Sequence, residues 1–291
     1  MKMLFVGVFD KLGRSTNVSQ ILALKKIGCE VYGYNFKQKE LQIGSAERDK
    51  HLVEYVKQNN FDLVLYSKST GISFDCFKKI NLITTTCLWW MDPLSTLGQH
   101  PEILEKSSEV DFVVTGVKNT IPIFYEKNKN TFFAIEGFDE NVDQPHDLKK
   151  QYDVTFIGSL HSQRQKLMNQ IVHPVNHVTN AYSRKHAEIV SKSKICLNFS
   201  TAGGASDRVF KTLAAGGFLL TSDWQGRDEL FSDGEHLIIY DDIQDLNDKI
   251  SYYLNNQQLR DKISMQGNKK VQEYGRIGWA QEILNFYEGI K

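Results

Sequence analysis

The sequence predicts an α/β protein with two halves, each an open parallel sheet covered by helices. Apolar runs of strand length alternate with amphipathic helical runs along the chain. The alternation stops at residues 136–151, a polar stretch with Gly137 and Pro145 that we interpret as a linker. It restarts with DVTFIGSL at residues 153–160, which resembles MLFVGVF at residues 3–9 because both carry an apolar strand into a glycine-containing loop.

In the first half, residues 4–9 are the first predicted strand, and residues 15–27 are a helix that Ser15 caps and Gly28 ends. Near-continuous apolar strands separated by helices are typical of a parallel sheet that is buried on both faces. The other strands of this half are predicted at residues 30–36, 62–66, 82–90 and 111–116.

The second half predicts strands at residues 153–160, 194–199, 217–221 and 237–240, followed by long helices. We expect an N-terminal domain at residues 1–140, a C-terminal domain at residues 152–275, and a last helix at residues 276–291 that packs back on the N-terminal domain. Ligands of open α/β sheets bind beyond the carboxyl ends of the strands, so the candidate site residues are sought in the loops that follow them.

Composition excludes several classes of protein. The 35 basic and 35 acidic residues give a formal net charge of zero, so no overall attraction to nucleic acid or to an anionic membrane is expected. The first apolar run is short and ends at Asp10, which argues against a signal peptide, and no run approaches the ~20 residues that span a bilayer. No C-x-x-C pair occurs, so we expect reduced core thiols in a cytoplasmic protein, namely Cys29, Cys76, Cys87 and Cys196.

Several common motifs of doubly wound proteins are missing. Neither Gly7 nor Gly158 begins a G-x-G-x-x-G fingerprint, and neither a P-loop nor a G-x-S-x-G element occurs. These absences count against a dehydrogenase, an NTPase and a hydrolase.

The most informative segment is FSTAGGASDRVFKTLAAGGFLLTSD at residues 199–223. After a strand, a loop with Gly203 and Gly204 leads to a helix that Ser206 or Asp207 caps. Because the loop has little side-chain bulk, a ligand can approach the N–H groups at the helix start. An ordinary tight turn before a capped helix is the alternative.

Two cations favour a ligand at this helix. Arg208 lies in the first turn and Lys211 follows three residues later on the same face. A cation near a helix N-terminus opposes the helix dipole and costs about 0.3–1 kcal/mol. A bound anion would explain both residues, whereas pairing with Asp207 or Asp223, or simple solvation, is the alternative.

The run SDRVFKTLAAGGFLLTSD, followed by GRDELFSDGEHLIIYDDIQDLNDKISYYLNN, resembles the C-terminal domain of CgeB-like glycosyltransferases, which are GT-B enzymes related to glycosyltransferase family 4. The stretch at residues 153–164 also resembles the start of that family's donor domain, and WWMDP at residues 89–93 is similar to its N-terminal aromatic-then-Asp element. The residues of the C-terminal resemblance are Arg208, Phe210, Ala214–Gly216, Phe218–Leu220, Glu229–Phe231 and Gly234–Glu235.

This resemblance implies two Rossmann-like domains facing each other across a cleft, with the donor in the C-terminal half and the acceptor in the N-terminal half. It also implies transfer of a sugar from a nucleoside-diphosphate sugar, which is a substrate and not a cofactor, with retention of configuration by analogy. The chain has no convincing D-x-D motif, so we expect the reaction to need no metal.

Donor residues follow from the resemblance and from the chemistry of the diphosphate. Arg164, Arg208 and Lys211 are the candidates to stabilise the leaving diphosphate, with Gly158 and the double-glycine loop Gly203–Gly204 beside it.

The chain departs from the family at the acidic residue that contacts the donor's ribose, because Lys211 occupies that position and Gly203 occupies its partner position. Asp228 and Glu229 are the nearest acidic substitutes.

On the acceptor side, Asp92 follows a strand and is our candidate to position the acceptor hydroxyl or to remove its proton. The alternative is a helix cap, with Pro93 as the first helical residue. The loop that holds Gly13, Arg14 and Ser15 either contacts the acceptor or only caps the first helix.

The sequence does not identify the acceptor, which leaves a polysaccharide, a protein, a small molecule and a hydroxymethylated base in phage DNA as candidates. A composition rich in Asn and Lys and a compact length are typical of a phage enzyme. Two alternative functions stay open: a non-catalytic nucleotide-sugar-binding module and a nucleotide-sugar epimerase of the same architecture.

Overall fold

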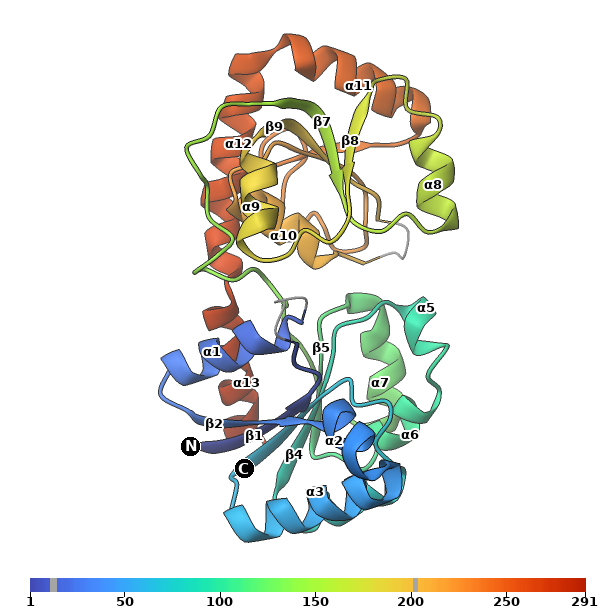
Figure 1. Cartoon of the computed structure of the whole chain (residues 1–291), viewed down its shortest axis with the longest axis vertical. Coiled ribbons are helices and arrows are strands. Elements are labelled where there is room, and N and C mark those ends of the chain that lie inside the picture. Colours follow the sequence, from blue (N-terminus) through green and yellow to red (C-terminus); the bar gives the residue numbers. More distant parts are fainter. Residues whose placement is uncertain (11–14, 201–203) are drawn as a thin grey trace. The chain divides into compact units, whose positions relative to one another are not determined.

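The computed structural model describes residues 1–10, 15–200 and 204–291. The chain forms two compact units, one made of Met1–Glu136 with Arg276–Lys291 and the other of Gly137–Gly275 (Figure 1). Each unit holds one parallel sheet covered by helices, so the predicted α/β class with two parallel sheets is confirmed.

The first unit has a six-stranded sheet in the order β2-β1-β3-β4-β5-β6, in which all neighbours are parallel. Its strands are β1 (Lys2–Gly7), β2 (Glu30–Asn35), β3 (Leu63–Ser67), β4 (Thr85–Trp90), β5 (Phe112–Thr115) and β6 (Thr131–Phe133). Its α-helices are α1 (Asn17–Lys26), α2 (Phe36–Ile43), α3 (Ser45–Asn59), α4 (Phe74–Asn81), α5 (Leu94–Leu97), α6 (Glu102–Ser107), α7 (Ile121–Lys127) and α13 (Arg276–Gly289).

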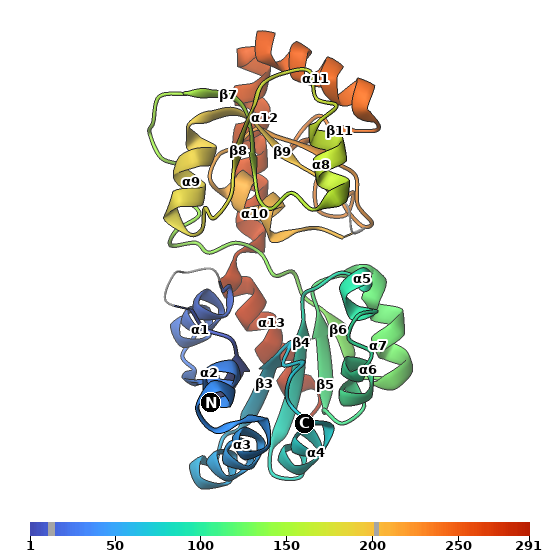
Figure 2. The same cartoon turned by 45° about the vertical axis from the view of Figure 1, so that its right-hand side comes forward.

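Alternate strand residues of the first unit enter two separate hydrophobic clusters. Leu4 and Val6 pack on one face with residues of α3 and α4, whereas Met3 and Phe5 pack on the other with residues of α1 and α13. Both faces are therefore buried, which is why the strands read as continuous apolar runs. The C-terminal helix α13 packs beside α1, and its Trp279 contacts Trp89 with ring centroids 5.5 Å apart (Figure 2).

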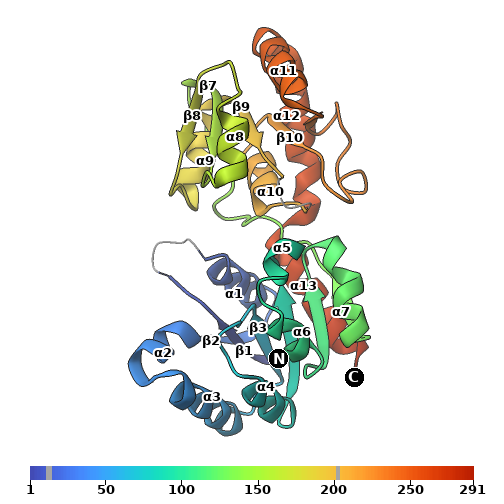
Figure 3. The same ribbon diagram turned by 90° about the vertical axis from the view of Figure 1, so that its right-hand side faces the viewer.

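The second unit has a five-stranded parallel sheet in the order β11-β10-β9-β7-β8. A Cβ on Gly267 of α12 would overlap the His236 carbonyl and lie 2.9 Å from Leu213 of α10, so this glycine lets α12 pack closely against both (Figure 3). The strands are β7 (Tyr152–Ile157), β8 (Val175–Val178), β9 (Ser193–Asn198), β10 (Leu219–Ser222) and β11 (Ile238–Tyr240), and the α-helices are α8 (Ser162–Met168), α9 (Arg184–Ser191), α10 (Asp207–Ala214), α11 (Ile243–Asn255) and α12 (Gln257–Val271).

Two strands were not predicted, and one predicted strand is too long. β6 has three residues, and β8 (VNHV) is an edge strand with polar residues inside it, so neither produces an apolar run. The strand predicted from residue 82 begins at Thr85, because the N–H groups of Ile83 and Thr84 donate to the Ile80 carbonyl and end α4.

The first helix starts later than predicted. Its N-cap is Thr16, and the Ser15 hydroxyl instead donates to the Val8 carbonyl at 2.6 Å and accepts from the Asn17 N–H at 3.2 Å. Gly28, with φ +93°, ends the helix as predicted.

The expectation of reduced core thiols is confirmed, because all four cysteines are free and buried. Within the described ranges, no helix is both long enough and apolar enough to cross a bilayer.

Candidate functional site

The guanidinium of Arg208 lies at the carboxyl end of the second sheet. Arg208 is in the first turn of α10, its Nη1 donates to Asn198 Oδ1 at 2.8 Å, and its guanidinium lies 5.2 Å from the centre of the Phe156 ring. Burial, and secondarily the nearby charge of Arg164, lowers the pKa of Arg208 to about 10. A cation whose pKa is lowered in this way is destabilised until an anion approaches it.

Gly158 makes room for this guanidinium. It follows β7 with φ +147°, and a Cβ at this position would lie 2.6 Å from Arg208 Nη2. Its N–H donates to the Val178 carbonyl at 2.9 Å, and its own carbonyl lies 2.8 Å from His177 Nε2. The predicted site residues Gly158 and Arg208 are therefore in direct contact.

Arg164 brings a second guanidinium to the same ring. It lies on α8, 5.9 Å from the centre of Phe156, and donates to the carbonyls of Ser159 and Phe199 at 3.4 Å each. Its Nε is buried without a partner, and burial lowers the pKa of the group. Within the described residues neither Arg164 nor Arg208 forms an ion pair with a carboxylate, so two cations share one aromatic ring. The Asp207 charge raises the pKa of Arg208, but burial and the charge of Arg164 outweigh it.

Lys211, the third predicted cation, differs from the two arginines. Its Nζ lies 2.5 Å from Asp207 Oδ2, so the alternative that Lys211 pairs with Asp207 is confirmed. Asp223, the other acidic candidate, pairs instead with Arg227 at 3.1 Å.

The helix start and its loop are partly as predicted. Ser206 is the N-cap residue of α10, but its side chain makes no capping hydrogen bond, and its hydroxyl lies 3.5 Å from Asn198 Oδ1. The Gly204 carbonyl accepts a hydrogen bond from the Ser200 hydroxyl at 3.0 Å, whereas Gly203 lies outside the described residues.

Asp228 and Glu229, the proposed acidic substitutes, lie in an exposed turn after β10. The structure brings Gly158, Arg164 and Arg208 together around Phe156.

His186 was missed by sequence reasoning. It lies in the first turn of α9, is 5% exposed, and neither ring nitrogen has a hydrogen-bond partner. Burial, then the charge of Lys211, lowers its pKa to about 3, and Asp207 and Arg208 also act on it. A lone histidine in a helical pattern gives no sequence signal for such a position.

In the first unit, Asp92 follows β4 at the carboxyl edge of the sheet. Lys68 Nζ lies 2.7 Å from its carboxylate, and the buried Trp90 indole donates to its backbone carbonyl at 2.8 Å. The N-cap of α5 is Pro93, so the alternative that Asp92 caps this helix is wrong.

The other acceptor-side candidates are Gly13, Arg14 and Ser15. Gly13 and Arg14 lie outside the described residues. Ser15 is bound to the backbone of its own segment, as described above.

Comparison with known proteins gives one family and one fold. The sequence model of the family described as glycosyl transferase-like matches residues 140–285. No curated protein sequence matches the chain significantly.

Solved structures match nearly the whole chain at low identity. HepE from Anabaena in complex with UDP-glucose has a TM-score of 0.74 at 12% identity, covering 99% of this chain and 100% of that chain. An alpha-glucosyltransferase in complex with UDP-glucose and DNA containing an abasic site has a TM-score of 0.70 at 10% identity, covering 99% and 98%. Sucrose-phosphate synthase from Thermosynechococcus elongatus has a TM-score of 0.67 at 10% identity, covering 99% and 98%.

Proposed function

Because the chain belongs to the glycosyl transferase-like family and has a GT-B fold, we propose that its second unit binds a nucleoside-diphosphate sugar with the diphosphate at Arg164 and Arg208. The observation that carries this proposal is the pair of guanidinium groups over Phe156, neither of which forms an ion pair with a carboxylate within the described residues. The enzyme is a glycosyltransferase, and the proposal assigns its donor site.

The chemistry of the leaving group explains why two guanidinium groups are needed. As the glycosyl–phosphate bond breaks, negative charge builds on the diphosphate, and fixed donors near its oxygens stabilise the transition state. Each guanidinium can give charge-assisted hydrogen bonds to phosphate oxygens. Burial, and secondarily the charge of Arg164, lowers the pKa of Arg208, and a bound anion would offset both effects.

Lys211 joins this site when the donor binds. It lies one turn after Asp207 on α10 and three residues after Arg208. The diphosphate carries more charge than one carboxylate, so it competes with Asp207 for the ammonium group. In this proposal the Lys211–Asp207 ion pair opens when the donor binds, and Lys211 turns to the phosphate.

We propose a UDP-sugar as the donor, metal-independent transfer and retention of configuration. UDP-glucose is bound in the solved structures of two proteins of similar fold, which supports the choice of nucleotide. The two guanidinium groups supply the positive charge that a divalent metal supplies to the diphosphate in other enzymes. Retention rests on analogy with the wider group.

On the acceptor side we propose that Asp92 positions the acceptor hydroxyl or removes its proton. A hydroxymethylated DNA base is one acceptor to test, because one protein of similar fold is an alpha-glucosyltransferase in complex with DNA. If the acceptor is such a base, the enzyme should incorporate sugar into modified duplex DNA, and its binding to this DNA should weaken steeply with salt. No incorporation with any donor that the enzyme binds would eliminate this acceptor.

Calorimetry with UDP and with GDP, each with and without EDTA, tests the donor site. We expect UDP to bind equally well after chelation and to bind far more weakly to Arg208→Met. Arg184→Met is the matched control, since this exposed arginine of the same unit pairs with Glu188 at 2.9 Å. Loss of UDP binding on chelation would refute metal independence, and unchanged binding to Arg208→Met would refute the assigned site.

A further inference from the structure

The Lys68 ammonium lies 2.7 Å from the Asp92 carboxylate, across the carboxyl ends of two neighbouring strands. Lys68 directly follows β3 and Asp92 comes two residues after β4, and these strands pair in parallel. The Lys68 N–H also donates to the Trp89 carbonyl at 3.0 Å, so backbone and side chain both attach Lys68 to the segment that carries Asp92. The side chains are 40% and 25% exposed, which leaves the pair accessible to an acceptor.

The backbone at Lys68 takes an unfavourable path to make this contact. Lys68 and Ser69 have φ values of +58° and +52°, so two consecutive residues with a Cβ are left-handed. Such residues are uncommon outside glycine, and surrounding contacts must hold them in place. Ser69 is fully buried, with its hydroxyl 3.3 Å from the carbonyls of Val6 and Ser67.

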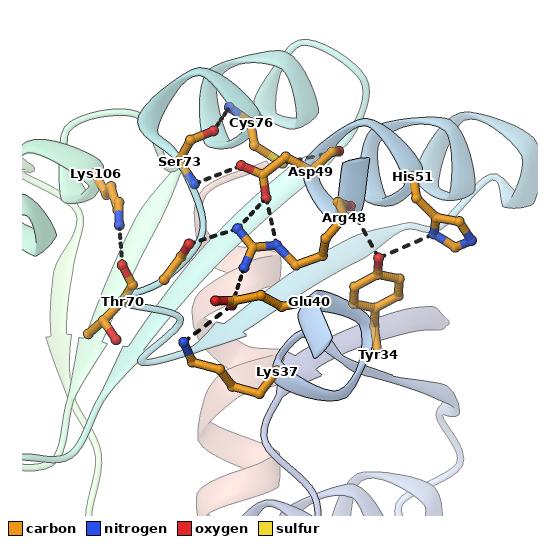
Figure 4. Close-up of polar contacts among 11 residues, drawn as sticks. Tyr34, Lys37, Glu40, Arg48, Asp49, His51, Thr70, Ser73, Cys76 and Lys106 are labelled. Atoms are coloured by element: carbon orange, nitrogen blue, oxygen red, sulfur yellow. Dashed lines mark hydrogen bonds and ion pairs between the residues drawn. The ribbon is translucent and has the colours of Figure 1, made fainter. Parts of the chain in front are cut away.

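Two buried cations bond to the next two residues of this loop. Lys106 Nζ donates to the Thr70 carbonyl at 2.8 Å, and Arg48 Nη2 donates to the Gly71 carbonyl at 2.7 Å (Figure 4). Lys106 is 3% exposed and Arg48 1% exposed, and burial lowers the pKa of Lys106.

Arg48 is itself fixed by two carboxylates, those of Glu40 at 2.6 Å and Asp49 at 2.7 Å (Figure 4). The second Asp49 oxygen accepts from the Ser73 N–H at 3.0 Å, at the far end of the same loop. Burying charged groups is unfavourable unless they are well bonded. Arg48 and Lys106 meet this condition partly through hydrogen bonds to backbone carbonyls of the loop after β3, and these bonds hold the loop in place.

We propose that Lys68 is a positioning residue for the acceptor reaction: it holds the Asp92 carboxylate in one orientation, so that one carboxylate oxygen faces the acceptor hydroxyl. The inference rests on the role proposed above for Asp92. The Asp92 backbone is fixed separately by the Trp90 indole, so Lys68 is left to fix the carboxylate. Arg48 and Lys106 act one step further away, because they fix the loop that carries Lys68.

Release of UDP from UDP-glucose, with water in place of the acceptor, provides an assay that needs no knowledge of the acceptor. Loss of a general base costs about 100-fold or more, which is the effect expected for Asp92→Asn. Misplacing a reacting group by about 1 Å costs up to about 100-fold, so Lys68→Met should lower kcat by roughly 10- to 100-fold while the calorimetric affinity for UDP stays unchanged. Lys68→Arg should restore most of kcat, because it keeps the charge beside Asp92.

The double variant Lys68→Met with Asp92→Asn shows whether Lys68 acts by positioning Asp92 or contributes to the reaction independently of it. If Lys68 acts only through Asp92, the double variant is no slower than Asp92→Asn alone. Lys79→Met is the matched control, since Lys79 pairs with Asp75 at the same 2.7 Å on the surface of the same unit. It should keep the full rate.

Three outcomes are decisive. A wild-type kcat for Lys68→Met beside an impaired Asp92→Asn overturns the inference and leaves the proposed role of Asp92 intact. A double variant whose loss of kcat equals the product of the two single losses also overturns the inference. A full rate for Asp92→Asn refutes the role of Asp92 itself, and with it the reason for positioning it.

Discussion

Arg208 occupies the space that a side chain at position 158 would need, because a Cβ on Gly158 would lie 2.6 Å from Nη2 of the guanidinium. The two residues are far apart in sequence, and each follows a different strand of the second sheet. The guanidinium can therefore take this position over Phe156 only because residue 158 is a glycine.

Gly158→Ala tests this dependence. The new Cβ should push Arg208 away from its place, so we expect UDP affinity to fall about tenfold, the loss that accompanies one weakened charge-assisted hydrogen bond. Gly234→Ala is the control, because Gly234 also has a positive φ (+76°) but a Cβ there would have no neighbouring atom within 4 Å. Calorimetric titration with UDP, together with melting temperatures, separates the two. Equal UDP affinities in the two variants would show that the close contact between Gly158 and Arg208 does not affect UDP binding.

Arg208→Met should leave the empty protein as stable as wild type or more stable. The methionine removes a buried cation that lies beside Arg164 without a carboxylate partner. Since the folded pKa is lowered to about 10, the charged group disfavours folding below that pH, and this cost fades as the pH rises through about 10. The stability advantage of the variant should therefore be present at neutral pH and shrink in alkali, which thermal melts can follow. A melting temperature well below that of wild type at neutral pH would show that Arg208 serves the fold.

Asp207→Asn and Lys211→Met together decide what Lys211 does. If Lys211 turns to the diphosphate, removing the competing carboxylate should raise UDP affinity, whereas removing the ammonium should lower it. Either change breaks an ion pair four residues apart on a helix, so each should cost only about 0.3–0.5 kcal/mol of stability. Calorimetry gives the affinities and urea denaturation gives the stabilities. Unchanged UDP affinity in both variants would leave Lys211 as a structural partner of Asp207.

Residues that follow predicted strands could be placed from the sequence. Gly158, Arg164 and Arg208 come after β7 or near the start of the helices that follow β7 and β9, and parallel strands bring such residues to one edge. The same logic placed Asp92 after β4. It could not give the partner of Asp92, because an Asp before a Pro fits a helix start as well as it fits an ion pair.

Nothing in the sequence indicated the roles of two residues, Lys68 and His186, because their backbone conformation and pKa arise only in the folded chain. Lys68 has a left-handed backbone and lies in a loop whose next residues accept hydrogen bonds from buried cations of α3 and α6. Burial, then the charge of Lys211 on α10, lowers the pKa of His186 below its ordinary value. Gly13, Arg14 and Gly203 remain predictions from the sequence, since the described residues do not include them.

The buried His186 should make the protein sensitive to acid. Its pKa is about 3 in the folded chain against an ordinary value of 6.5, so the folded state binds this proton less tightly than the unfolded state does. The stability that comes from keeping the ring neutral is complete above the unfolded value and is lost as the pH falls below it, by about 1.4 kcal/mol per pH unit. The charges of Lys211 and Arg208 oppose protonation and that of Asp207 favours it, with burial the largest cause.

His186→Leu tests this account, because leucine is apolar and neither ring nitrogen of His186 has a partner to lose. At neutral pH the variant should be as stable as wild type or slightly more stable, since two buried polar atoms without partners are removed. On acidification from about pH 6.5 to pH 5 it should lose about 2 kcal/mol less than wild type, following the slope for one proton. Urea denaturation across this pH range measures both free energies of unfolding. Parallel losses in the two proteins would mean that the imidazole reaches water or a carboxylate in solution, and that the ring is not buried there.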